Sequence, residues 1–165
     1  MGLIKTLDGF LDSVGLFSYT DLEISQIVED RLNKENFEGT FYFVGKETPL
    51  FVNSNWETIE NKILNNDGKL KLAVCEKPKL PNFLLKNLNN LKNIEIYKIN
   101  KSVNYSSALF YDTFEIWSNP KKPQFYLNHF VSQNRIRNYK LLFEDSKNEL
   151  TKIDTRSCFS LKPIN

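Results

Sequence analysis

The side chains that could carry out chemistry are few in this sequence, and they form no recognisable catalytic or metal-binding pattern. The single histidine, His129, has no second His and no Cys close to it in the sequence, which argues against a zinc site. Asp112 and Glu115 flank a short turn, where Asp is expected for backbone reasons alone. The glycine-rich nucleotide loops, the Gly-x-Ser-x-Gly elbow and the His-Glu-x-x-His motif are missing. We therefore expect no catalytic residues, no metal and no cofactor.

Two groups of basic residues are the other candidates for binding. Lys77 and Lys79 follow a predicted strand that ends at Cys75, and open α/β folds bind ligands at the carboxyl ends of their strands. The second group consists of Lys121, Lys122, Arg135 and Arg137. The simpler interpretation of each group is a solvated surface. Nucleic-acid binding would need a continuous basic stripe with stacking aromatic side chains. The aromatic residues mostly fall at core positions instead, so nucleic-acid binding is not expected.

The charge is unevenly distributed along the chain. Residues 1–68 contain five Lys or Arg and twelve Asp or Glu, whereas residues 69–165 contain seventeen and eight. The net charges are therefore −7 and +9. Such asymmetry is typical of an anion-binding face, or of two halves that attract each other within one chain or between chains.

The elements that position these residues alternate between strands and helices. Strands are predicted at Thr40–Val44, Lys69–Cys75 and Ile94–Ile99, with helices at 54–65 and Pro81–Leu91 between them. The strands Ser107–Tyr111 and Phe114–Trp117 flank a tight turn and predict a hairpin. A closing helix, or pair of helices, is expected over 125–146. This order predicts an α/β fold with a mixed, mainly parallel sheet flanked by helices.

Two amphipathic helices are predicted before the first strand. In Met1–Phe17 the apolar residues recur every three or four positions. In Thr20–Asn33 the pair Thr20 and Glu23 forms a capping box. We expect residues 1–36 to be an N-terminal helical segment and residues 37–165 an α/β domain. The first helix could pack on the domain, on a protein partner or on a membrane surface.

Length and composition indicate one cytoplasmic domain. The 165 residues are enough for a single domain with its own core. The sequence has no apolar run long enough to span a membrane and no signal peptide. Its two cysteines, Cys75 and Cys158, make neither a disulfide framework nor a metal cluster, which fits a reducing compartment.

The run from Trp56 to about Leu142, roughly half of the chain, resembles one half-domain of the phospholipase D-like fold. The similar features, in order, are a helix ending in Asn-Asp-Gly68, the strand Lys69–Cys75, the loop Glu76–Pro81, the helix to Leu91, the edge strand Ile94–Ile99 and a strand reaching Asp112. The segment Ile116-Trp-Ser-Asn-Pro120 is similar to the family's Gly-Ser-x-Asn segment. It departs from that segment because Trp117 replaces the Gly, and Ser118 and Asn119 are adjacent.

The resemblance implies a non-catalytic relative. Active members carry His-x-Lys, then Asp after four intervening residues, and the His attacks phosphorus while the Lys binds the phosphoryl oxygens. With Asp112 at the Asp position, Ser107 takes the Lys position and Tyr105 the His position. The nucleophile and the phosphate-binding cation are both missing.

What remains of the family's cleft would be lined by Tyr105, Ser107, Asp112, Ser118 and Asn119, and would hold a small polar or anionic ligand. We expect a sensor or adaptor domain that binds a ligand or a protein. The alternatives are a phosphodiesterase or nuclease with an atypical site, and a partner-binding immunity or adaptor protein that uses the N-terminal helices.

The family's enzymes place two half-domains face to face, and a single half would expose that face. We therefore expect a twofold-symmetric homodimer, with its contact near the strand Ser107–Tyr111 and the turn Ser118–Pro120. The competing arrangement is a monomer in which Met1–Asn33 covers the face.

The first testable prediction is that the chain does not hydrolyse phosphodiesters. Tyr105 and Ser107 stand where His and Lys would be needed, and a tyrosine with a pKa near 10 is a poor nucleophile at neutral pH. A chromogenic phosphodiester should show no turnover above background. Turnover that is lost in Tyr105→Phe would contradict the prediction.

Overall fold

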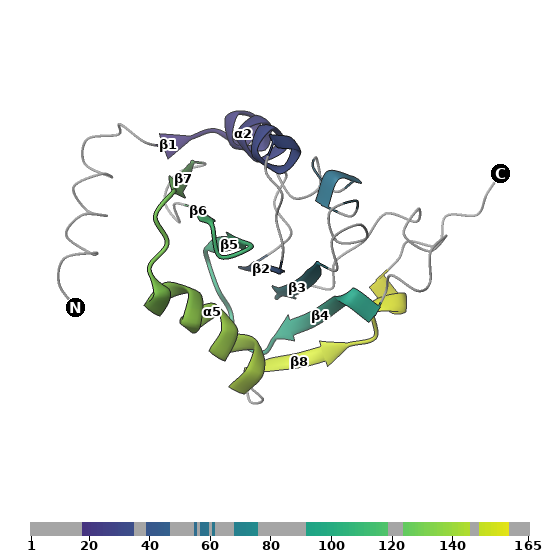
Figure 1. Ribbon diagram of the computed structural model, residues 1–165. Coiled ribbons are helices and arrows are strands. Elements are labelled where there is room, and N and C mark those ends of the chain that lie inside the picture. The colour runs from purple at the N-terminus through teal and green to yellow at the C-terminus, as the bar shows by residue number, and fades with distance from the viewer. Residues whose placement is uncertain are drawn as a thin grey trace.

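The computed structural model describes residues 18–34, 39–46, 55, 57–59, 61, 68–75, 92–118, 124–145 and 149–158 (Figure 1). Their dominant feature is one eight-stranded sheet with the strand order β1-β7-β6-β5-β2-β3-β4-β8. The strands are β1 (Ser18–Tyr19), β2 (Thr40–Gly45), β3 (Lys69–Val74), β4 (Ile94–Ile99), β5 (Ser106–Phe110), β6 (Phe114–Ser118), β7 (Phe125–Asn128) and β8 (Leu150–Ile153). The described helices include α2 (Asp21–Lys34), α5 (Gln133–Asp145) and the 3₁₀ helix η3 (Thr155–Cys158).

The sheet is mixed, and most of its strand pairs are antiparallel. Among the described strands only β2–β3 and β3–β4 are parallel, and the other five pairs are antiparallel. The predicted fold class, a mainly parallel sheet in the phospholipase D-like arrangement, is therefore wrong. The physical reason is that β5, β6 and β7 are joined by short connections, which permit only antiparallel neighbours.

Helix α2 begins where the sequence predicts. The backbone N–H of Thr20 donates to Glu23 Oε2 at 2.8 Å, and the N–H of Glu23 donates to Thr20 Oγ1 at 3.3 Å. This reciprocal pair is a capping box that satisfies two N-terminal donors. Of the two predicted N-terminal helices, α2 is the second, and the first, Met1–Phe17, lies outside the described residues.

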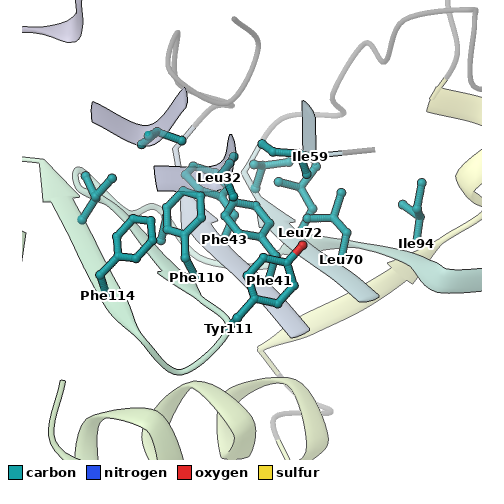
Figure 2. Packing of buried hydrophobic residues seen from close by; sticks show 14 of the residues in the cluster. Leu32, Phe41, Phe43, Ile59, Leu70, Leu72, Ile94, Phe110, Tyr111 and Phe114 are labelled. Carbon is teal, nitrogen blue, oxygen red and sulfur yellow. The ribbon is translucent and has the colours of Figure 1, made fainter. Parts of the chain in front are cut away.

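The two faces of the sheet carry separate hydrophobic clusters. The α2 face buries Ile24, Val28 and Leu32 of the helix against aromatic and aliphatic side chains of the central strands. Figure 2 shows these side chains on the side of the sheet that faces away from α5. Phe110 is central here, because its ring lies 4.5 Å from that of Phe41 and 4.4 Å from that of Phe114.

The α5 face is covered by a smaller cluster. Ile136, Tyr139 and Phe143 lie on one side of the helix at spacings of three and four, and pack on Tyr42, Val44, Ala73 and Leu109, among others, in the sheet. In Figure 1, α2 and α5 accordingly lie on opposite sides of the sheet.

The predicted hairpin is present as β5 and β6. Phe110 pairs with Phe114, and the N–H of Thr113 donates to the carbonyl of Phe110 at 2.9 Å. Tyr111 and Asp112 have φ values of 49° and 59°, in the left-handed region. Two successive residues in this region fit the twist of a tight hairpin turn, and the side chain of Tyr111 is buried.

Other predictions fail near the C-terminal end. A closing helix, or pair of helices, is predicted over 125–146, but Phe125–Asn128 form β7 and α5 begins only at Gln133. Beyond residue 146, where the sequence predicts no element, Leu150–Ile153 form strand β8 and Thr155–Cys158 form helix η3. In the predicted helix at 54–65, positions 57–59 and 61 are helical. The predicted helix Pro81–Leu91 lies outside the described residues.

No helix within the described ranges is long and apolar enough to cross a membrane.

The packing of Phe110 leads to a prediction about stability. Replacing a fully buried Phe by Ala removes its contacts and leaves a cavity, at a cost of about 3–5 kcal/mol. Phe110→Ala should lower the free energy of unfolding by this amount in urea titrations. The matched control is Phe130→Ala, because Phe130 is 92% exposed and its loss should change stability by less than about 0.5 kcal/mol. Equal effects of the two substitutions would contradict the position of Phe110 in the core.

Candidate functional site

A pocket of about 250 Å³ lies between the start of β5 and one side of α5. It is lined by Val44, Tyr105, Ser107, Arg135, Asn138, Tyr139 and Leu142. Two of the predicted ligand-binding residues, Tyr105 and Ser107, therefore lie together in a pocket.

The register of the sheet and the periodicity of the helix bring these residues together. Val44 of β2 is directly opposite Ser107 of β5, so both side chains point to the α5 face. On α5, Arg135, Asn138 and Leu142 are three and four residues apart, which places them on one side. Ser132 caps this helix, since its hydroxyl accepts the N–H of Arg135 at 3.3 Å.

A buried network of polar side chains forms the inner end of the site. Glu115 of β6 is only 2% exposed. Its Oε1 accepts the hydroxyl of Tyr139 at 2.7 Å and the Nε–H of Arg135 at 2.7 Å. The hydroxyl of Ser107 contacts that of Tyr139 and lies 3.5 Å from the same Oε1. One carboxylate oxygen thus joins β5, β6 and α5.

The environment of Tyr139 changes its acidity. Burial raises the pKa of Tyr139 well above its usual range, and the neighbouring negative charge of Glu115 raises it further. The phenol therefore stays protonated at physiological pH. In this form it donates its hydrogen to Glu115, which helps to satisfy the buried carboxylate.

Three residues of this network were absent from the predicted ligand-binding set. The sequence pattern places Glu115 beside a turn and Arg135 in a basic group, and it gives no signal for Tyr139. A signal was present for Glu115, because it stands between Phe114 and Ile116 in a strand whose other residues are mostly apolar. A charge in such a strand needs a buried partner.

The remaining predicted residues lie elsewhere. Asp112 follows β5 at the end opposite to Tyr105 and forms an ion pair with Lys140 at 2.9 Å. Ser118 supports the hairpin, because its hydroxyl accepts the N–H of Ser106 at 2.6 Å. Asn119, Lys77 and Lys79 are outside the described residues. The structure thus brings Tyr105 and Ser107 together and separates Asp112 from them.

Comparison with known proteins adds a likeness of fold. No known protein family matches the chain, and no curated protein does. Among solved structures, the archaeal chromatin protein TrmBL2, reported to show a novel mode of DNA binding, is similar with a TM-score of 0.50 and 10% sequence identity. The match covers 90% of this chain and 60% of that chain, so this chain spans about three fifths of TrmBL2. The likeness concerns the fold alone. The fold is therefore similar to that of TrmBL2, and the predicted phospholipase D-like arrangement is wrong.

Among the described residues that line the pocket, the hydroxyl of Ser107 has no free general base beside it. Ser107 contacts Tyr139, and a tyrosine whose pKa is raised is a poor general base. The histidine is not part of this site, because His129 Nδ1 lies 2.7 Å from Nη1 of Arg31 on α2, at the other face of the sheet. Within the residues that the structure describes, no group of three or more His, Cys, Asp or Glu could hold a metal ion.

The raised pKa of Tyr139 predicts how stability changes in alkali. The unfolded chain releases the phenolic proton near pH 10, whereas the folded chain retains it to higher pH. Above about pH 10 the unfolded chain therefore binds fewer protons, and this group lowers the free energy of unfolding by up to ~1.4 kcal/mol per pH unit. Tyr139→Phe should make the fall in stability between pH 9.5 and 11 shallower by about this amount in urea titrations.

The control for lost packing is Phe143→Leu. Phe143 belongs to the same cluster as Tyr139 and carries no proton. This variant should lower stability at every pH and leave its slope with pH unchanged. If the free energy of unfolding of Tyr139→Phe falls with pH as steeply as that of the unaltered chain, Tyr139 is not the group that causes the fall.

Proposed function

We propose that this chain is a non-catalytic binding domain that holds a small polar ligand between α5 and the sheet. The observation that supports this proposal is the pocket itself, which is lined by hydroxyl, amide and guanidinium groups together with the apolar side chains of Val44 and Leu142. Ligand sites commonly combine apolar walls with a few well-placed polar groups.

The rigidity of the inner end favours binding. Ser107 and Tyr139 are buried and fixed by their mutual contact and by Glu115. Polar groups that are already held in position lose little freedom when a ligand binds. Tyr105, at 44% exposure, stands at the outer side of the pocket, where its ring can cover a bound molecule.

The same geometry argues against a covalent mechanism. A nucleophilic serine needs a base that accepts its proton. Beside Ser107 the nearest carboxylate oxygen, Glu115 Oε1, is 3.5 Å away and already accepts hydrogen bonds from Arg135 and Tyr139. The serine hydroxyl is therefore a hydrogen-bonding group for a ligand.

The likeness to TrmBL2 does not extend the proposal to DNA binding. At 10% identity a shared fold is compatible with unrelated functions. About two fifths of the TrmBL2 chain lies outside the region that is similar to this chain. The DNA contacts of TrmBL2 are therefore not assigned to the shared region.

The expected homodimer remains a proposal, and the structure narrows its possible contact. Strand β5 is paired on both edges, with β2 and β6, and residues 107–110 are buried within one chain. A contact in this region would therefore have to involve residues beyond the strand, such as Ser118 at the end of β6.

Binding can be tested with a panel of small molecules that differ in charge. The panel consists of glucose, glycine, isovalerate and ethyl phosphate, which represent a neutral polyol, a zwitterion, a carboxylate and a phosphate monoester. At least one should bind and shift the NMR signals of Ser107, Arg135 and Asn138. Asn138→Trp, which places a large ring at the pocket, should weaken that binding roughly tenfold or more.

The matched control is Asn134→Trp. Asn134 is also an exposed asparagine on α5, but it does not line the pocket, so this variant should bind like the unaltered chain. Binding that resists Asn138→Trp, or no binding of any member of the panel, would overturn the proposed function.

A further inference from the structure

Two aromatic side chains lie on the α5 face of the sheet but outside both hydrophobic clusters. The register places Trp117 of β6 directly opposite Ser107 of β5 on one side and Tyr126 of β7 on the other. Ser107 contacts Tyr139 of α5, so the side chains of this row point to the α5 face. The rings of Trp117 and Tyr126 are stacked, with their centroids 5.6 Å apart. Neither residue belongs to the cluster under α5 or to the cluster under α2.

Helix α5 packs mainly on other parts of this face. Among the described contacts, its hydrogen bonds to β6 go to Glu115, one row before Trp117. Its second half packs through Phe143 on the central strands and on β4. Trp117 and Tyr126 are accordingly half-buried rather than buried. The surface formed by β6 and β7 therefore presents a stacked aromatic pair beside α5.

The chain enters the sheet next to this aromatic pair. Ser18, the first residue of β1, is directly opposite Tyr126. Residues 1–17 are therefore attached one strand away from Tyr126 and two strands away from Trp117. Helix α2, which follows β1, packs on the other face of the sheet and does not reach this surface (Figure 1). Of the predicted N-terminal helical segment, only residues 1–17 remain to cover the pair.

Residues 1–17 carry an apolar stripe that suits such a surface. Leu3, Leu7, Leu11 and Val14 recur every three or four positions, which predicts an amphipathic helix. A single helix of this length is marginally stable in water, so its apolar side needs a surface to pack on. Such a helix would be about 25 Å long at ~1.5 Å per residue. The distance from β1 to β5 is about 14 Å at ~4.8 Å per strand, so the helix can cross both β7 and β6.

We propose that residues 1–17 form an amphipathic helix that packs its apolar stripe on Trp117 and Tyr126, beside α5 and on the same face of the sheet. Two helices then cover this face, α5 over the central strands and the N-terminal helix over β6 and β7. The driving force is the removal of the half-buried aromatic rings and of the stripe from water. This contact is formed within one chain and does not depend on the proposed ligand.

The contact can be observed directly in the unaltered full chain. Labelled leucine methyl groups and tryptophan rings should give nuclear Overhauser effects between Leu7 or Leu11 and the indole ring of Trp117. A sample that mixes labelled and unlabelled chains identifies their origin. Effects within one chain support the inference. Effects that arise only between chains would show that a second copy covers this surface, and would overturn it.

Substitution of the apolar stripe provides an independent test. Leu7→Asp combined with Leu11→Asp should release the helix and raise acrylamide quenching of Trp117 fluorescence by roughly twofold or more, because solvent then reaches the ring. The background substitution Trp56→Phe leaves Trp117 as the single tryptophan of the chain. Leu22→Asp is the matched control, since Leu22 is 79% exposed and belongs to α2 on the other face. It should leave the quenching unchanged.

The remaining outcomes are also decisive. Equal quenching in the stripe variant and in its unaltered background would overturn the inference. If Trp56→Phe fails to fold, the nuclear Overhauser effects in the unaltered chain still decide the question. A third outcome is that no effects to Trp117 are seen, and that the leucine signals of residues 1–17 disappear on addition of phosphatidylglycerol vesicles. The stripe would then bind a membrane surface, and the inference would be wrong.

Discussion

The buried carboxylate of Glu115 holds the first half of α5 on the sheet. A charged group at this depth is tolerated only when donors surround it, and here Arg135 and Tyr139 donate directly to one oxygen. Removing one partner of a buried ion pair typically costs about 3–5 kcal/mol, because the other charge is left without compensation. The second half of the helix is attached differently, through Phe143, whose ring lies 5.5 Å from that of Tyr42 and 5.4 Å from that of Tyr97. The helix is therefore fixed by polar contacts at one end and by aromatic packing at the other.

This division explains why the pocket lies where it does. The α2 face of the sheet carries the larger cluster, which is made mostly of large apolar side chains. On the α5 face, the network around Glu115 replaces apolar packing near Ser107, and polar side chains there border an open space.

Local patterns predicted much of the secondary structure, but the relations between elements were harder to infer. The strands at Thr40, Lys69 and Ile94 and the hairpin around Asp112 follow from β-branched and aromatic density and from turn residues, which act over a few positions. The direction of pairing depends on which strands become neighbours, and β7 could not be recognised because its four residues, Phe125–Asn128, precede a helical pattern without a clear boundary. Strand β8 has four residues, which are too few to show a reliable alternation of apolar and polar side chains.

The candidate site was predictable in part. The family resemblance pointed to Tyr105 and Ser107. The fold that it implied is wrong, yet both residues line the pocket. Arg135 and Tyr139 could not be placed beside them from sequence alone, because they are about 30 positions away and meet Ser107 only through the packing of α5. Asp112, which was selected through the same resemblance, lies away from the site.

The strand order also determines when different parts of the sheet can form. Strands β5, β6 and β7 are neighbours both in the sequence and in the sheet, so their pairing closes only short loops. The outer strands are different: β8 joins β4 through pairs such as Ile99 with Leu150, and β1 joins β7 through Tyr19 with Phe125. Long loops make such pairs entropically costly to close. During synthesis, this edge of β4 therefore stays unpaired until β8, some fifty residues later in the sequence, has been made. An exposed edge of this kind is a template for pairing with other chains, and the order of synthesis makes it the part of this fold that is most open to misassembly before β8 covers it.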